Sequence, residues 1–283
     1  MFNPATDAAD ALRIIDDLSA ATTVHDVDFE GSRVRWRSIG TGSPLVLLHG
    51  GHGSWLHWVR NAQALSRQHT VWLADMPGYG DSGPLAGSND LANLVRTTVA
   101  TLNQVLGADT EIDLGGFSFG GLVAAHVASQ RGHIRKLALV GSAGHGTPRR
   151  QTTAMVNWRR SDDVNVMLED LRHNLLALMI HDPANLDPLS LEVHRYACVN
   201  TRFRSKALSQ AAKVPALLVG MDVPMLFVWG EHDVTAQAEL AGPLFQDGHQ
   251  ERRWMAIEDA GHWVQFEQAE RVNEVLLNWF APA

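Results

Sequence analysis

The sequence predicts an α/β protein built on a mostly parallel sheet, with one helical insertion. Two observations support this prediction. Apolar runs alternate with segments of helix length, and one long segment without a strand pattern separates the last two runs from the others. The chain has 283 residues, of which 45% are apolar and 19% charged, so it is long enough to bury a large core. We therefore expect a folded globular protein.

The first two expected strands form a hairpin. Residues 24–30 and 33–40 alternate polar and apolar side chains around Gly31-Ser32. This alternation is typical of antiparallel strands with one solvated face, and it predicts that the hairpin starts the sheet.

The remaining expected strands are nearly continuous apolar runs, the pattern of strands buried on both faces of a parallel sheet. They cover residues 44–50, 70–75, 111–117, 134–141, 224–230 and 252–258. Because helix-length segments separate most of these runs, we expect a parallel α/β sheet.

The segment between residues 141 and 224 has no strand pattern and predicts a helical cap. Helical spacing relates Val164, Met167, Leu168, Leu171, Leu175, Leu178 and Met179, and a second helix is predicted from Leu189, Val193, Tyr196 and Phe203. We expect a core domain at 1–141 and 214–283 and a cap at 142–213. Residues 1–20 predict an exposed helix.

Charge and cysteine content restrict the partners and the compartment. With 31 acidic and 23 basic residues, the formal charge of −8 opposes nucleic-acid binding. The single cysteine, Cys198, cannot form an intramolecular disulfide, and the acidic N-terminal residues lack the pattern of a secretory signal. The apolar stretch 214–230 is interrupted by Pro215, Asp222 and Pro224, so no membrane span is predicted. We expect a cytoplasmic protein with a small-molecule substrate, and the sequence is compatible with a homo-oligomer.

The strongest chemical signal is the segment 115–121, which places Ser118 in a G-x-S-x-G pattern between an expected strand and an expected helix. A serine on such a sharp turn has a strained backbone, and the positions two before and two after it must be small. Gly116 and Gly120 meet that demand. Ser118 is therefore the predicted nucleophile, and the alternative is a glycine-rich turn whose serine caps a helix.

A serine nucleophile needs a base and a group that orients the base. Asp233 follows the strand at 224–230, and His262 follows the next one, so the order is Ser, Asp, His. Glu231, Asp222 and Asp259 are alternative acids. Asp222 precedes its strand and Asp259 lies only three residues before His262, which favours Asp233.

The glycine-rich segment His49-Gly50-Gly51-His52-Gly53 ends another buried strand. Backbone N–H groups of Gly51 and Phe119 are predicted to form an oxyanion hole, which stabilises negative charge on the substrate carbonyl oxygen. The histidines at 49, 52 and 57 have no recognisable metal-ligand spacing, so neither a metal nor a cofactor is expected.

One motif is a decoy. Residues 78–83 fit the dinucleotide pattern G-x-G-x-x-G, but Pro84 and the loop-like residues after it exclude the helix that would receive a pyrophosphate. We interpret this segment as a turn.

These motifs together resemble the α/β-hydrolase superfamily over residues 24–281. The resemblance rests on His49-Gly50-Gly51, on the segments 75–82 and 230–233, on the serine turn and on Gly261-His262. It implies the α/β-hydrolase fold, with an eight-stranded, mostly parallel sheet flanked by helices and a helical cap inserted after strand six.

Within the superfamily, residues 262–267 and the cap segment around Arg202 are similar to meta-cleavage-product hydrolases, which cut a carbon–carbon bond in ring-fission products. Those enzymes usually carry Asn before the serine and Met after it, where this chain has Phe117 and Phe119. The two phenylalanines favour an apolar ester or lactone. Predicted substrate contacts are His49, Gly50, Phe117, Arg202 and Trp263; Trp263 has an alternative role in packing, and Arg202 an alternative role as a surface group.

The sequence thus predicts a serine hydrolase that works through an acyl-enzyme, with an ester or lactone as its substrate. The alternatives are a carbon–carbon bond hydrolase and a non-catalytic receptor that uses the hydrolase pocket. Epoxide and halide-carbon hydrolases of this fold are disfavoured, because they carry Asp at the position of Ser118.

Overall fold

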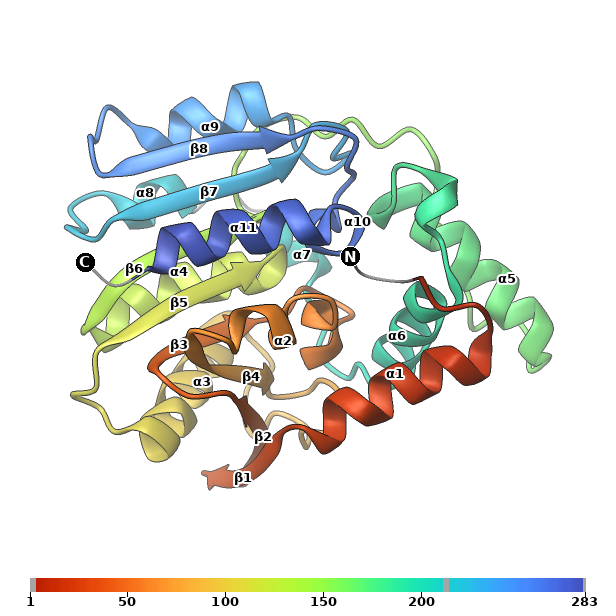
Figure 1. Ribbon diagram of the computed structural model, residues 1–283, viewed down its shortest axis with the longest axis horizontal. Coiled ribbons are helices and arrows are strands. Elements are labelled where there is room, and N and C mark those ends of the chain that lie inside the picture. The colour runs from red at the N-terminus through yellow and green to blue at the C-terminus, as the bar shows by residue number, and fades with distance from the viewer. Residues whose placement is uncertain (1–3, 211–213, 282–283) are drawn as a thin grey trace.

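The structure, a computed structural model, describes residues 4–210 and 214–281 (Figure 1). The expected domain limits at residues 1, 213 and 283 lie outside the described residues.

Eight strands form one sheet in the order β1-β2-β4-β3-β5-β6-β7-β8. The pairs β1/β2 and β2/β4 are antiparallel, and the other neighbours are parallel. The bounds are β1 Thr23–Phe29, β2 Ser32–Ile39, β3 Ser43–Leu48, β4 His69–Asp75, β5 Ile112–Phe117, β6 Ile134–Val140, β7 Met225–Gly230 and β8 Arg252–Ile257. The bounds of each strand agree with those of an expected strand to within two residues, so the predicted fold class is confirmed.

Helices cover both faces of the sheet. One face packs against α3 (Leu91–Leu106), α4 (Phe119–Arg131), α8 (Val214–Leu218) and α9 (Ala238–Gln246). The other packs against α2 (Ala62–Leu65), α10 (Val264–Glu267) and α11 (Ala269–Phe280). In Figure 1, α11 crosses in front of β5 and β6 while α4 lies behind them.

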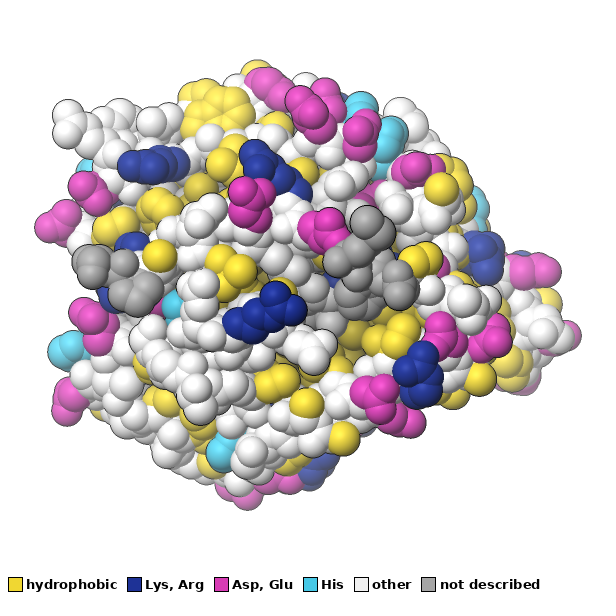
Figure 2. Space-filling model, viewed as in Figure 1, with side chains coloured by type: hydrophobic (Ala, Val, Ile, Leu, Met, Phe, Trp, Pro, Cys, Tyr) yellow, Lys and Arg dark blue, Asp and Glu magenta, His cyan; other side chains and the backbone are white. Residues whose placement is uncertain are grey.

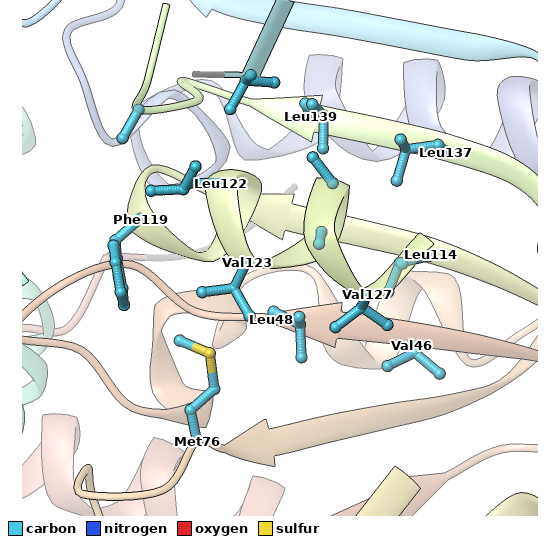
Figure 3. Close-up of a cluster of buried hydrophobic side chains, with 14 of the residues drawn as sticks. Val46, Leu48, Met76, Leu114, Phe119, Leu122, Val123, Val127, Leu137 and Leu139 are labelled. Atoms are coloured by element: carbon cyan, nitrogen blue, oxygen red, sulfur yellow. The ribbon is translucent and has the colours of Figure 1, made fainter. Parts of the chain in front are cut away.

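The core around α4 shows the apolar packing on one face of the sheet. Figure 3 shows Leu122, Val123 and Val127 of α4 among the side chains of the central strands. The strand residues labelled there are Val46, Leu48, Leu114, Leu137 and Leu139, which are buried, with exposed fractions of 1% or less. Burying such side chains contributes about 1.5 to 3 kcal/mol each, and this packing holds α4 against the sheet.

The segment between β6 and β7 contains helices and no strand among its described residues. Its elements before α8 are α5 (Val164–Asn174), the π-helix η2 (Leu175–Met179), the short η3 (Pro183–Asn185), α6 (Pro188–Val199) and α7 (Lys206–Ser209). In Figure 1, α5 and α6 lie beyond the ends toward which the arrows of β5 and β7 point. The division into core and cap domains stays a prediction.

The insert differs from expectation in two details. The helix predicted from Val164 to Met179 changes to π-helical bonding at Leu175, where Ile180 N–H donates to Leu175 O at 2.9 Å. The second helix, α6, ends at Val199, so Phe203 lies outside it. Phe203 is buried because it packs against Phe119 and Tyr79 of the core, at ring-centroid distances of 5.9 Å for both pairs.

The sequence predicted an exposed N-terminal helix, but one side of this helix is buried. Helix α1 (Ala8–Ala20) buries Ala11 and Leu18 and contacts α6. The short 3₁₀ helix η1 (Trp55–Trp58) belongs to the same apolar cluster.

The face of the molecule in Figure 2 carries no concentrated basic patch. Figure 2 shows Lys and Arg side chains scattered among Asp and Glu on the face in view. Within the described residues, no helix combines the length and apolar character needed to cross a bilayer.

Candidate active site

Ser118 occupies a sharp turn between β5 and α4. Its φ of 54° and ψ of −118° lie outside the regions that side-chain-bearing residues favour. The turn is held by Ser118 N–H, which donates to Val140 O at 2.9 Å, and by Ser118 O, which accepts from Ala143 N–H at 3.0 Å. This strained conformation aims the serine side chain out of the end of the sheet.

The glycines that flank the serine are required by close packing. A methyl group on Gly116 would collide with the carbonyl of Gly120, and one on Gly120 would collide with the carbonyls of Leu48 and His49. Larger residues would therefore push the serine turn away from β3.

A continuous chain of polar contacts joins Ser118, His262 and Asp233. His262 Nε2 lies 2.9 Å from Ser118 Oγ, and His262 Nδ1 lies 2.8 Å from Asp233 Oδ2. The histidine side chain is 5% exposed and the aspartate is fully buried. Because a carboxylate can only accept, Nδ1 carries the ring proton and Nε2 can accept the serine proton.

The environment of Asp233 keeps its carboxylate ionised. Burial acts to raise the pKa of Asp233, but His262 and the hydrogen bonds from His262 and Thr235 outweigh it and hold the pKa below its usual value. Thr235 donates to Asp233 Oδ1 from its backbone N–H at 2.7 Å and its hydroxyl at 2.8 Å. Sequence reasoning missed Thr235, although its position two residues after Asp233 is a signal for such a turn.

The candidate oxyanion donors are Gly51, in the loop after β3, and Phe119, the first residue of α4. A methyl group on Gly51 would lie 3.7 Å from Phe119 Cβ and would collide with the hydroxyl of Ser205. Neither the Gly51 nor the Phe119 N–H donates to another group in the described part of the chain. Gly51 therefore lies close to Phe119, the residue that follows Ser118, and the role of the two N–H groups as oxyanion donors stays a prediction.

His49 and Gly50 hold the loop that carries Gly51 through hydrogen bonds within the protein. His49 is fully buried, with Nδ1 2.8 Å from Gly50 O and Nε2 accepting from Met76 N–H at 3.0 Å. Burial lowers the pKa of His49 to about 4, so the ring is neutral. Gly50 N–H donates to His57 Nδ1 at 3.2 Å. Both polar atoms of His49 are engaged within the protein, which favours a supporting role over substrate contact.

The other predicted substrate contacts lie in different surroundings. Phe117 is buried against His57 and His262, at centroid distances of 5.3 and 5.1 Å. Trp263 is fully buried, stacks on Phe266 and donates to His57 O at 3.1 Å, which favours its packing alternative. Arg202 is exposed, follows α6 rather than lying in it, and donates to Ser82 O at 3.2 Å.

Neither the histidines near Gly50 nor the glycines at 78–83 form a second site among the described residues. The described residues contain no group of three His, Cys, Asp or Glu side chains arranged to hold a metal ion. Residues 78–83 form a turn in which Gly78 and Gly80 have φ values of 84° and 48°, and no helix follows before Leu91. The turn interpretation accounts for the glycines there.

Acid is expected to destabilise the protein because neutral histidines are buried near this site. Burial lowers the pKa values of His49 and His194 to about 4, from 6.5 in the unfolded chain. Between these values the unfolded state binds more protons, so stability is present above pH 6.5 and is lost as the pH falls toward 4. Each histidine can contribute up to about 3 kcal/mol.

Urea unfolding between about pH 7 and about pH 4.5 measures this loss. His194→Gln removes one titrating group and should make the pH dependence shallower, whereas His133→Gln, at a side chain that is 54% exposed, should not. An unchanged slope for His194→Gln would contradict the assignment.

Fold and site together define an enzyme of the α/β-hydrolase fold. Residues 45–275 match the profile of the Alpha/beta hydrolase family, and the chain belongs to that family.

Two relatives in sequence and one solved structure of the same fold are similar to this chain. A dihydrolipoyllysine-residue acetyltransferase component of the acetoin cleaving system of Pseudomonas putida is 31% identical over 87% of this chain and 66% of its own length. A 2-hydroxy-6-oxononadienedioate/2-hydroxy-6-oxononatrienedioate hydrolase of Klebsiella pneumoniae is 25% identical over 89% of this chain and 92% of its own. The naproxen esterase structure from Bacillus subtilis superposes with a TM-score of 0.76 at 18% identity, covering 96% of this chain and 97% of its own.

Proposed function

We propose that this enzyme is a serine hydrolase of carboxylic esters or lactones with small apolar substrates, in which Ser118 is the nucleophile, His262 the base and Asp233 the orienting acid. The observation that supports the proposal is the contact chain from Asp233 Oδ2 through His262 to Ser118 Oγ, with distances of 2.8 and 2.9 Å. A non-catalytic receptor has no need for these contacts between Asp233, His262 and Ser118.

The proposed reaction has two acyl-transfer steps. His262 Nε2 takes the proton of Ser118 Oγ as the oxygen attacks the carbonyl carbon, and the N–H groups of Gly51 and Phe119 stabilise the oxyanion. The imidazolium then protonates the leaving oxygen, which departs as an alcohol. Water, deprotonated by His262, attacks the acyl-enzyme and releases the acid, and the proton returns to Ser118.

The preference for an apolar substrate rests on the rings around the serine. Phe117 and Phe119 flank Ser118, and Phe203 of the insert stacks on Phe119. Such surroundings favour apolar acyl groups. We also propose a cytoplasmic location, supported by Cys198, which is a buried free thiol.

The second candidate is carbon–carbon bond hydrolysis of meta-cleavage products, favoured by the Klebsiella relative and by residues 262–267. That chemistry needs a partner for the substrate carboxylate. Arg202, the residue suggested by the sequence, is instead bonded to backbone carbonyls, Ser82 O at 3.2 Å and Asn200 O at 3.3 Å. Ester hydrolysis therefore ranks first.

A comparison of substrates tests this ranking. We expect kcat/KM for neutral p-nitrophenyl esters of graded chain length to exceed that for a ring-fission product by tenfold or more, about 1.4 kcal/mol. A tenfold preference in the opposite direction would promote the carbon–carbon hydrolase. Saturable ligand binding without turnover of either substrate would favour the receptor.

A further inference from the structure

We infer that Glu267 is a positioning residue that holds the loop of His262 against the insert. This inference rests on the proposed role of His262 as the base. Glu267 ends α10, five residues after His262, and is 8% exposed. It does not contact Ser118 or Asp233 in any hydrogen bond of the described residues.

The carboxylate of Glu267 joins two segments that are far apart in sequence. Glu267 Oε2 accepts from Gly261 N–H at 2.7 Å. Its Oε1 accepts from the N–H groups of His181 and Asp182 at 2.9 and 3.1 Å, with Asn185 Nδ2 at 3.4 Å. Residues 181 and 182 lie two and three residues after the end of the π-helix η2 of the insert.

The insert also holds the other side of His262. The backbone N–H of Trp263 donates to Met179 O at 2.7 Å. The backbone is therefore fixed on both sides of His262, at Gly261 through Glu267 and at Trp263 directly. An imidazole ring carried on a backbone held at both flanking residues keeps a narrow range of orientations toward Ser118.

The same part of the insert contacts the loop of the proposed acid. The ring of His181 stacks on that of His232, with centroids 3.8 Å apart and an interplanar angle of 20°. His232 immediately precedes Asp233. Residues 179–182 thus contact both loops that carry the partners of Ser118, and we define Glu267 with residues 179–182 as the clamp.

The chemistry of the clamp requires an acceptor-only group. Three backbone N–H groups converge on the carboxylate, and burial raises its pKa even though these hydrogen bonds oppose the rise. Glutamine has almost the same volume, but its amide NH₂ would face one set of N–H donors. Glu267→Gln therefore breaks one side of the clamp while leaving the packing in place.

The test measures hydrogen exchange in the clamp and the reactivity of Ser118. We expect Glu267→Gln to increase amide hydrogen exchange in segments 179–182 and 260–263. It should slow modification of Ser118 by a fluorophosphonate by about 10- to 100-fold, the cost of misplacing a catalytic group by about 1 Å. In ester hydrolysis kcat should fall while KM stays within about twofold.

Asp113→Asn is the matched control. Asp113 is also a buried carboxylate, 1% exposed, but it pairs with Arg135 near the start of β5, away from Ser118. The Asp113→Asn variant should be less stable than wild type, but its Ser118 should react with the fluorophosphonate at the wild-type rate. Equal slowing in both variants would overturn the positioning role, and so would unchanged exchange in Glu267→Gln.

A second variant tests the clamp from the other side. A methyl group on Gly261 would lie 2.8 Å from His181 N and 3.0 Å from Glu267 Oε2. Gly261→Ala should therefore separate the loop from the insert and slow modification, even if Glu267→Gln does not fold, and a wild-type rate would overturn the inference. If wild type itself did not react with the fluorophosphonate, the proposed function would fail, and hydrogen exchange would still decide whether the clamp exists.

Discussion

Ser118→Ala is expected to fold like wild type and to lose ester hydrolysis by about four to six orders of magnitude in kcat. The hydroxyl is the atom that forms the acyl-enzyme, and no neighbouring group can replace it. Its contact within the site is with His262 Nε2, at 2.9 Å, so its removal deletes one hydrogen bond and no packing. Alanine can occupy the same turn, since its backbone strain equals that of serine.

Turnover of p-nitrophenyl esters measures the loss of activity, and the thermal unfolding midpoint shows whether the variant folds like wild type. Ser129→Ala is the matched control because Ser129 is an exposed serine on the same helix, α4. Retention of more than about a tenth of wild-type turnover by Ser118→Ala would remove Ser118 as nucleophile, because a triad member lost from a cooperating set costs far more.

The sheet could be predicted from the sequence because each strand is specified by its own residues. The run at 224–230, for example, is buried along all of β7, and burial on both faces demands apolar residues at every position. The alternation at 33–40 likewise identified β2, whose inner positions Val34 and Trp36 are fully buried. Local pattern and final environment agree in these elements, so periodicity was sufficient.

The helical insert was less predictable because its details depend on contacts with the core. Phe203 fits a helical spacing with Tyr196, yet it leaves the helix to pack on Phe119. The same holds for α1, whose acidic residues suggested full exposure while Ala11 and Leu18 pack inward. A spacing rule cannot show which partner a side chain meets.

Some residues of the candidate site could be predicted from the sequence, and others could not. Ser118, Asp233 and His262 could be proposed because each comes shortly after a predicted strand, β5, β7 and β8, and that order can be read from the sequence. The contact of Thr235 with Asp233 and the role inferred for Glu267 rest on hydrogen bonds that only the folded structure shows. Trp263 was predicted as a substrate contact, but its indole N–H is bonded to His57 O, which the sequence could not indicate.

Asp233→Asn is expected to lower kcat by about three to four orders of magnitude while the protein remains folded. Thr235 donates two hydrogen bonds to Asp233 Oδ1, so the amide oxygen of an asparagine would take that position. Its NH₂ group would then face His262 Nδ1, at the place where Oδ2 now lies 2.8 Å away. The imidazole would have to accept at Nδ1 and carry its proton on Nε2, where it can no longer take the proton of Ser118.

Glu231→Gln and Asp222→Asn are the controls for this prediction, and both should keep near wild-type turnover. Glu231 is exposed and its carboxylate lies 3.6 Å from His232 Nε2, while Asp222 is exposed before β7 begins. Neither faces His262, so neither can set its tautomer. Turnover of a p-nitrophenyl ester by all three variants decides the assignment: if Asp222→Asn proved the damaging change and Asp233→Asn did not, the acid would have to be placed before β7 rather than after it.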